Sequence, residues 1–317
     1  MSADPMQFEE PILRIRRRIE ELAALEAEPT AQAEMAELRT KLTKVSHEIY
    51  SNLTPWQKTL VARHPQRPYT LDFIGFLFED FVEIHGDRKF SDDPAIVGGF
   101  GRFRGQACAI VGHQKGRNTK EKIFRNFGQP RPEGFRKALR IMKMAEKFKL
   151  PIFSFVDTQG AYPGVGAEER GQAEAIAVNL REMAALEVPV IITVLGEGGS
   201  GGALALGVGD RVLMFEHAVY SVISPEGCAA ILWKNSSAAP DAASAMRITA
   251  VDLKRFGIID EIVPEPEGGA HSDPQGAADN LAPYLEKSLK ELMKIKPPQL
   301  PEERYKKFRK MGMFEKG

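Results

Sequence analysis

The chain has 317 residues, 43% of them hydrophobic and 27% charged, a composition typical of globular proteins rather than disordered, collagen-like or membrane proteins. Lys and Arg together number 43, as do Asp and Glu, so the net charge is zero. A protein whose whole surface binds nucleic acid or anionic lipid would carry excess positive charge, so any basic site must be local. The two cysteines exclude a four-thiolate zinc site and a disulfide framework within this chain, and favour a reducing, cytoplasmic compartment.

No segment predicts export or membrane insertion. Asp4, Glu9 and a basic cluster at 14–18 interrupt any apolar run that a signal peptide would need. The most apolar stretches, near 188–195 and 203–208, are far shorter than the roughly 20 residues that cross a bilayer. We therefore expect a protein that does not enter the membrane.

The N-terminal segment, 1–54, is predicted to form a helical hairpin. Residues 9–47 carry apolar side chains at three- and four-residue steps, with a break at Pro29. These apolar positions are Ile12, Ile15, Ile19, Leu22 and Leu25 in the first arm and Met35, Leu38, Leu42 and Val45 in the second. Because the chain has no net charge, we expect this hairpin to pack against the same chain or a partner subunit rather than to bind nucleic acid.

A basic stretch follows the first predicted strand. Phe73, Phe76, Leu77 and Phe81 predict one helix face closed by His85-Gly86-Asp87, and residues 106–112 then predict a strand. Residues 113–126 are sharply basic, with Lys115, Arg117, Lys120, Lys122 and Arg125. This pattern fits either a solvated loop or a glycine-punctuated phosphate site between a strand and a helix.

The middle of the chain repeats one construction of buried strand, glycine-rich turn and helix. A helix beginning at 132, with apolar side chains through Phe148, leads to a strand at 150–156, and a second helix spans 167–187. Its inward positions are predicted to be Ala173, Ile176, Ala177, Leu180 and Met183. A strand at 188–195, a second glycine turn, a short helix at 203–208 and a strand at 211–215 follow. Such repeats predict an α/β domain whose turns face a ligand.

The last third of the chain predicts shorter elements. A strand and a turn at 224–227 lead to a helix that reaches Trp233, and a strand is expected at 258–263. A loop at 266–274 and a helix at 282–295 follow, before a polar tail with little to bury.

The glycine turn at 196–202 matches three motifs. Gly196, Gly198 and Gly201 fit the dinucleotide-binding pattern G-x-G-x-x-G, with Glu216 as its ribose acid, but the helix before Asp210 is too short for a parallel crossover. Gly198, Ser200 and Gly202 fit the hydrolase pattern G-x-S-x-G, with Asp210 and His217 downstream. Those two partners follow too closely to arrive on separate loops.

The third interpretation is an oxyanion hole built from backbone amides. The amides of Gly198, Gly199, Gly201 and Gly202 can approach a ligand closely because glycine has no Cβ, and the helix end adds partial positive charge. Each such donor is worth about 3 kcal/mol of transition-state stabilisation. We favour this interpretation over tight packing alone, which would need fewer glycines.

An earlier glycine turn follows the same logic. Gly164, Val165 and Gly166 precede a helix whose first turn holds Glu168 and Glu169. The two glutamates are more simply explained by the helix dipole than by catalysis.

Three long motifs resemble the carboxyltransferase alpha subunits of bacterial acetyl-CoA carboxylase. They are PIFSFVDTQGAYPGVGAEERGQAEAIA at 151–177, GEGGSGGALALGVGD at 196–210 and YSVISPEGCAAILWK at 220–234. Shorter matches are LTPWQ at 53–57, ARHPQRPY at 62–69, HGDR at 85–88, RNFG at 125–128 and PEPEGGAH at 264–271. Gln159 departs from the resemblance, which would place proline there, and a turn tolerates either residue.

The resemblance implies an α/β, crotonase-like (ClpP/crotonase) fold of repeated ββα units over 55–296, followed by a C-terminal tail at 297–317. It implies an α2β2 assembly with a zinc-bearing beta subunit, no metal in this chain, and cooperation with biotin carboxylase and the biotin carboxyl carrier protein. The implied reaction moves a carboxyl group from N1-carboxybiotin on the carrier to acetyl-CoA, giving malonyl-CoA in the first committed step of fatty-acid synthesis.

The resemblance also assigns the site. Gly201 and Gly202, helped by Gly198 and Gly199, would stabilise the biotin ureido oxygen, and the beta subunit would hold the thioester. Gly164, Val165 and Gly166 are expected to contribute wall and donor contacts, and the basic stretch from Lys115 to Arg125 to contact CoA phosphate or a partner. The alternatives left open are a serine hydrolase using Ser200, a carboxyltransferase for another acyl-CoA, and a non-catalytic scaffold subunit.

Overall fold

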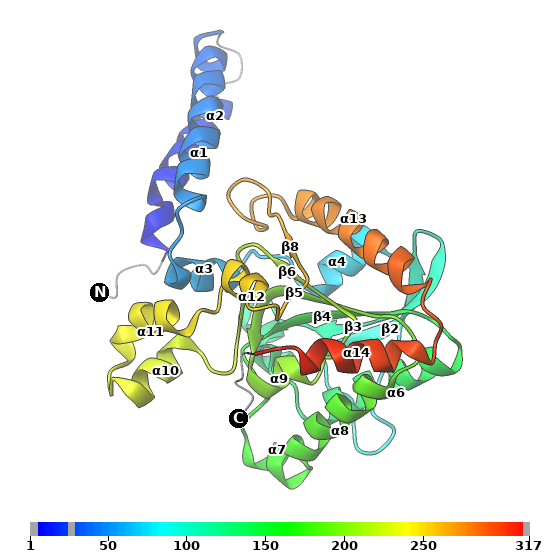
Figure 1. Ribbon diagram of the computed structural model, residues 1–317. Helices are drawn as coiled ribbons and strands as arrows, with labels where there is room; N and C mark the ends of the chain where they lie inside the picture. Colours follow the sequence, from blue (N-terminus) through cyan, green and yellow to red (C-terminus); the bar gives the residue numbers. More distant parts are fainter. Residues whose placement is uncertain (1–5, 25–28, 313–317) are drawn as a thin grey trace.

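The computed structural model describes residues 6–24 and 29–312. Two helices, α1 (Glu10–Ala23) and α2 (Pro29–Tyr50), stand out from the body of the molecule (Figure 1). Leu22 of α1 packs with Met35 of α2, so each arm buries one apolar stripe. The predicted helical hairpin is confirmed, although Leu25 lies outside the described residues. Proline begins α2 because its missing N–H costs nothing at the first helical position.

The described chain contains one sheet of eight strands. These are β1 (Glu79–Glu83), β2 (Ile96–Phe103), β3 (Gln106–His113), β4 (Ile152–Thr158), β5 (Val190–Gly199), β6 (Arg211–Phe215), β7 (Val219–Ser221) and β8 (Glu261–Val263). Their order is β1-β2-β3-β4-β5-β6-β8, with β7 beside the end of β5. The pairs from β3 to β8 are parallel, with Ile152 of β4 beside Val190 of β5. The carboxyl ends of β3, β4 and β5 therefore meet at one edge.

Helices cover both faces of the sheet. The helices α4 (Thr70–Leu77) and α13 (Pro274–Leu292) lie on one face, and α6 (Pro132–Lys147), α8 (Gln172–Ala185) and α14 (Gln299–Arg309) lie on the other (Figure 1). Every residue of β4 and β5 is buried, which explains their nearly continuous apolar sequences. The shorter helices are α3 (Pro55–Ala62), α5 (Thr119–Phe124), α7 (Val165–Glu169), α9 (Ser200–Leu204), α10 (Pro225–Leu232), α11 (Ala239–Met246) and α12 (Ala250–Arg255), with 3-10 turns η1 (Gln7–Glu9), η2 (Asn126–Gly128) and η3 (Ser236–Ala238).

The single helix predicted for 167–187 is wrong, because Gly171 has a φ of +81° and separates α7 from α8. The buried stripe of α8 is Gln172, Ala175, Asn179 and Met183, so Ala173 and Ala177 are exposed rather than inward. The amides of Gln172 and Asn179 donate to buried backbone carbonyls, including those of Pro130 and Ala205. Apolar periodicity cannot predict a core face that contains two such polar side chains.

Three other expectations are corrected. Phe81 lies in β1 instead of on the preceding helix, and Phe148 follows α6 with 61% of its surface exposed. The second glycine turn is largely strand, because β5 continues to Gly199 and pairs there with β7. The polar tail folds into α14, which buries Leu300 and Arg304. None of the helices described is long and apolar enough to cross a membrane.

Arg304 fixes α14 to the sheet. Its guanidinium donates to both carboxylate oxygens of Asp210, at 3.0 and 2.9 Å, and to the carbonyls of Met183 and Leu186. Both side chains of the ion pair are almost fully buried. Removing one partner would leave the other charge buried and unpaired.

We predict that Arg304→Met lowers the free energy of unfolding by about 3–5 kcal/mol, because it isolates the Asp210 carboxylate. Urea denaturation followed by circular dichroism measures this change. Lys306→Met on the exposed side of the same helix is the control, and an equal loss in both variants would contradict the assignment.

Candidate active site

A cavity of about 690 Å³ lies at the carboxyl ends of β4 and β5. Its walls come from the segment after β4, from α8 and from the segment between β7 and α10. Its lining includes Gln159, Tyr162, Gln172, Ile176, Gly201 and Glu226. In sheets with parallel strands, ligands bind at this edge because connecting loops converge there.

A second cavity, of about 390 Å³, adjoins the first. The two share Arg63, Gln129 and Gln159 in their linings. The second also contains Lys115 and Lys122 from the basic stretch, together with Tyr69 and Phe127. The fold therefore brings part of the basic stretch and part of the glycine turn to one continuous groove.

The glycines of the second turn are needed for close packing at three positions. A Cβ at Gly198 would meet the ring of Tyr220 at 2.7 Å, and one at Gly199 would overlap the carbonyl of Gln159. A Cβ at Gly202 would lie 2.5 Å from the backbone nitrogen of Ala161. Gly201 differs, since its Cβ would find only Ile176 at 3.6 Å and the residue lines the cavity.

The turn between β5 and α9 presents backbone amides at the cavity edge. Ser200 is exposed and has a φ of +54°, an unusual conformation for a residue with a side chain. Gly201 and Gly202 follow it in the first turn of α9, where amides have no partner within the helix. This geometry permits, at Gly201, the donor role expected from the sequence.

Asp157, the one acidic residue of β4, connects the neighbouring segments at this edge of the sheet through hydrogen bonds. Its Oδ1 accepts from Lys115 Nζ at 2.6 Å and from the amide of Glu197 at 3.0 Å. The side chain of Asp157 is 1% exposed. Sequence reasoning did not single out Asp157, although a charged residue ending an apolar strand was the available signal.

Arg63, which follows α3, lines the larger cavity and binds two glutamates from other segments. Its Nη2 donates to Glu197 Oε1 at 2.6 Å and its Nη1 to Glu226 Oε1 at 2.5 Å. Glu197 is in β5 and Glu226 is in the first turn of α10, so one side chain joins three segments. The motif at 62–69 contained Arg63, but nothing in its spacing predicted these partners.

The earlier glycine turn lies next to the cavity. Gly164, Val165 and Gly166 are absent from its lining, whereas Pro163 and Glu168 are part of it. A Cβ at Gly164 would overlap the ring of Tyr162, so this glycine lets that ring lie against the backbone and form the wall. The guanidinium of Arg131 also lies over the ring of Tyr162, 4.9 Å from its centroid.

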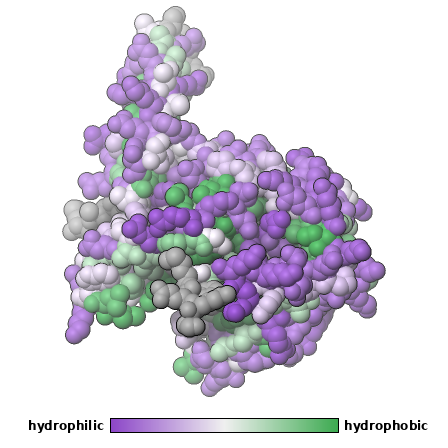
Figure 2. Space-filling view, viewed as in Figure 1, coloured by the Kyte–Doolittle hydropathy of each residue, from purple (hydrophilic) through white to green (hydrophobic). Residues whose placement is uncertain are grey.

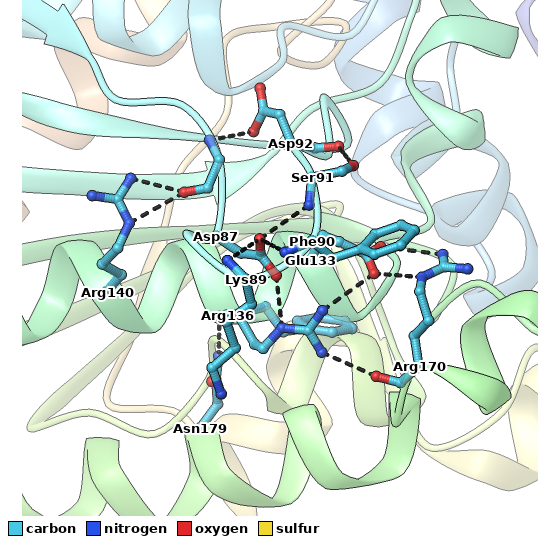
Figure 3. A network of polar contacts seen from close by, with 12 residues as sticks. Asp87, Lys89, Phe90, Ser91, Asp92, Glu133, Arg136, Arg140, Arg170 and Asn179 are labelled. Carbon is cyan, nitrogen blue, oxygen red and sulfur yellow. Dashed lines mark hydrogen bonds and ion pairs between the residues drawn. The ribbon is translucent and has the colours of Figure 1, made fainter.

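A buried polar network anchors this wall to the rest of the domain (Figure 3). Arg170, directly after α7, donates to Glu133 Oε1 at 2.6 Å, and Arg136 donates to Asp87 Oδ2 at 2.8 Å. The guanidinium of Arg170 also lies over the ring of Phe90, 4.7 Å from its centroid. Asp87 of the HGDR motif thus binds α6 through Arg136. Helix α6 in turn binds Arg170, at the end of α7, through Glu133.

The five basic residues of the stretch from 115 to 125 occupy different environments. Lys115 is paired with Asp157, and Arg117 pairs with Asp72 and lies over the ring of Tyr69. Arg125 donates to the carbonyl of Pro94. Lys120 and Lys122 have no ion pair within the described chain, and Lys122 lines the smaller cavity.

The hydrolase and dinucleotide interpretations lack their required geometry. Asp210 is bound by Arg304, and the ring of His217 packs on Tyr50, 5.4 Å between centroids. Neither residue contacts Ser200 in the part of the chain described. The short α9 follows a strand that runs through Gly199, so no long helix follows the glycines as a dinucleotide site requires.

One set of side chains in the described residues has the composition of a metal site. The ligand atoms of Glu9, His64 and His271 lie within 4.8 Å of one another. However, the two imidazoles stack with centroids 3.8 Å apart and planes 24° apart, so their in-plane lone pairs do not converge on one point. Burial lowers the pKa of His64 to about 4 and that of His271 to about 3, which keeps both rings neutral.

A family model described as acetyl co-enzyme A carboxylase carboxyltransferase-like matches residues 5–312. The chain belongs to this family. It is 58% identical over 312 residues to the acetyl-coenzyme A carboxylase carboxyl transferase subunit alpha of Syntrophotalea carbinolica, with 98% of each chain covered. The same subunit of Thioalkalivibrio sulfidiphilus is 56% identical over 319 residues, with 100% of each chain covered.

Solved structures confirm the crotonase-like carboxyltransferase fold. The 12S transcarboxylase aligns with a TM-score of 0.59 and 19% identity, over 74% of this chain and 44% of that one. The Pseudomonas malonate decarboxylase MdcD–MdcE heterodimer aligns with a TM-score of 0.55 and 16% identity, over 68% and 89%. This chain therefore spans less than half of the longer transcarboxylase chain.

Within this carboxyltransferase fold, Gly201 and Gly202 in the first turn of α9 should respond differently to an added methyl group. We predict that Gly202→Ala lowers the free energy of unfolding by about 1–3 kcal/mol, because its Cβ would press on the backbone of residues 160 and 161. Gly201→Ala has room and should leave that free energy unchanged or raise it by up to about 1 kcal/mol. Thermal unfolding of the two variants side by side measures the difference, and equal melting temperatures would contradict it.

Proposed function

We propose that this chain is the alpha subunit of an acetyl-CoA carboxylase carboxyltransferase, which moves a carboxyl group from N1-carboxybiotin to acetyl-CoA and forms malonyl-CoA. The observation that carries the proposal is the position of Gly201, in the first turn of α9 and on the lining of the larger cavity. Family membership and near full-length identity of 58% to a named alpha subunit support it.

The chemistry requires stabilised negative charge rather than a strong side-chain base. Carboxybiotin supplies carbon dioxide when its N–C bond breaks, and the freed ureido nitrogen can take a proton from the methyl carbon of the thioester. The amides of Gly201 and Gly202, with Gly198 and Gly199 shaping the turn, would donate to the ureido oxygen as its charge grows. Such fixed donors need no reorganisation during the reaction.

The larger cavity suits a bicyclic ureido substrate. It is lined by polar amide groups, including Gln129 and Gln159, and by the apolar side chain of Ile176. Pockets for small ligands combine apolar walls with a few placed polar groups in this way. Gly164, Val165 and Gly166 would contribute by supporting the wall at Tyr162.

We infer that the thioester hole and the zinc belong to a beta subunit in an α2β2 assembly, and that biotin carboxylase and the biotin carboxyl carrier protein complete the enzyme. An exposed apolar surface on α10, the helix whose first turn reaches the larger cavity, supports association with a partner. Ile231 and Leu232 of α10 are 68% and 69% exposed, and Figure 2 shows hydrophobic surface where Figure 1 places α10. Exposed apolar patches of this kind mark interaction sites.

The first test compares two neighbouring residues of the glycine turn. Gly201→Val should lower kcat by about 100-fold, because its side chain would occupy the space in front of the amides. Ser200→Ala should keep most of the activity. The assay measures carboxyl exchange between malonyl-CoA and biotin with purified alpha and beta chains together, and repeats it with propionyl-CoA in the forward direction.

The outcomes separate the alternatives. Loss of activity in Ser200→Ala would favour a serine nucleophile, and full activity in Gly201→Val would contradict the amide hole. A complex that transfers no carboxyl group to any thioester would leave a scaffold role. Preference for propionyl-CoA would identify another acyl-CoA as substrate.

The smaller cavity yields a second prediction. Lys122→Gln should raise the KM for the CoA substrate about fivefold at low salt, because an unpaired cation there would attract a CoA phosphate. The difference should shrink as ionic strength rises. Lys120→Gln, exposed on the same helix, is the matched control, and an equal KM shift in both variants would contradict a specific contact at Lys122.

A further inference from the structure

His113 ends β3 and lies beneath the glycine turn. The side chain is fully buried, at 0% exposure, although neither cavity is lined by it. It stands between two segments of the candidate site, the end of β4 at Asp157 and the start of α9 at Gly202. A buried imidazole in this place must have both ring nitrogens satisfied or bear a cost.

The hydrogen bonds around His113 determine its tautomer. The backbone N–H of Asp157 points at Nδ1 at 3.4 Å, so Nδ1 is an acceptor. Nε2 lies 3.2 Å from the carbonyl oxygen of Gly202, which can only accept. The neutral imidazole therefore carries its proton on Nε2 and donates it to Gly202.

The carbonyl of Gly202, which accepts from His113, does not receive the usual helical hydrogen bond from the amide four residues later. The helix ends at Leu204, and the amide of Leu206 bonds to the carbonyl of Ala203 instead of that of Gly202. A Cβ at Gly202 would also have no room against the backbone of residues 160 and 161. Gly202 is thus held between the segment after β4 and the ring of His113.

The charges near His113 do not bring its pKa into the range where it could act as a general acid or base at neutral pH. Burial lowers the pKa of His113 to about 4, against the Asp157 carboxylate and the backbone groups of Phe155 and Gly202, which raise it, and the Lys115 ammonium lowers it further. The ring is therefore neutral at pH 7. Both nitrogens are already engaged, so no proton is available for substrate.

We infer that His113 is a positioning residue of the carboxyltransferase site: its Nε2–H holds the Gly202 carbonyl and thereby sets the direction of the amides that begin α9. The inference rests on the proposed function of those amides. It adds a second requirement to the glycine-rich sequence, namely a side-chain donor for the carbonyl of Gly202.

A matched pair of variants tests this role, because Gln and Met have similar shapes and only Gln offers a donor near Nε2. His113→Met should lower kcat for biotin carboxylation by about 10- to 100-fold, since small displacements of donors are costly. His113→Gln should stay within about threefold of the parent, and the KM for malonyl-CoA should change little in either variant, because the thioester is held elsewhere. The pH profile should keep its shape in both, since a general acid or base would have removed a limb.

Full activity in His113→Met would overturn the inference. Equal impairment of the Gln and Met variants would assign His113 to packing and would overturn it as well. If His113→Met fails to fold, the activity of His113→Gln decides: a loss beyond tenfold contradicts the role of the donor.

A readout independent of activity separates this inference from the proposed function. Nitrogen NMR of the full chain labelled on its histidines should show His113 protonated at Nε2 and unprotonated at Nδ1 at pH 7, with the resonance assigned by its loss in His113→Gln. The opposite tautomer, or a charged ring, would overturn the inference even in an active enzyme. A correct tautomer in a complex without carboxyl transfer would instead count against the proposed function.

Discussion

The carboxylate of Asp157 is the constraint on which the site depends. It is almost completely buried, and a buried carboxylate is tolerated only when charges and N–H groups compensate it. Lys115 comes from the segment after β3 and the Glu197 amide from β5, so satisfying this one group fixes the ends of three parallel strands relative to one another. Gly196 is required beside it, since a Cβ there would lie 2.7 Å from Asp157 Oδ1.

Hydrogen bonds and ion pairs also connect Asp157 to the walls of the cavity. Glu197, whose amide is held by Asp157, uses its carboxylate to bind Arg63, and Arg63 binds Glu226 at the start of α10. The glycine turn lies between these ion pairs, and its backbone is held by contacts that do not involve substrate. Amides fixed in advance stabilise developing charge better than mobile ones, because no free energy is spent on orienting them.

Much of this organisation could be predicted from sequence, for identifiable reasons. Long apolar runs predicted β4 and β5, and the density of glycines marked the turn that reaches the cavity. The partners of Asp157 and Arg63 could not be predicted, because Arg63 and Glu197 are 134 positions apart and meet only in the folded chain. The buried face of α8 was predicted wrongly because the polar side chains of Gln172 and Asn179 point inward and donate to buried carbonyls. The basic stretch looked uniform in sequence, yet the fold pairs Lys115 and Arg117 and leaves Lys122 at the smaller cavity.

The pairing of charges also explains how a groove with many ionisable side chains can serve a reaction without its own base. Arg63, Lys115 and Glu226 line the two cavities, and each is bound by an opposite charge. Arg63 and Glu226 keep their charged forms against the effect of burial, because hydrogen bonds to Glu197 and then Glu226 raise the pKa of the arginine and the hydrogen bond from Arg63 lowers the pKa of Glu226. The shifted pKa values keep Arg63 and Glu226 charged at neutral pH, and the ion pairs give the cavity a fixed field and rigid walls. In the proposed reaction, catalysis by oriented backbone amides needs those two properties, and proton transfer is left to the ureido nitrogen of the substrate.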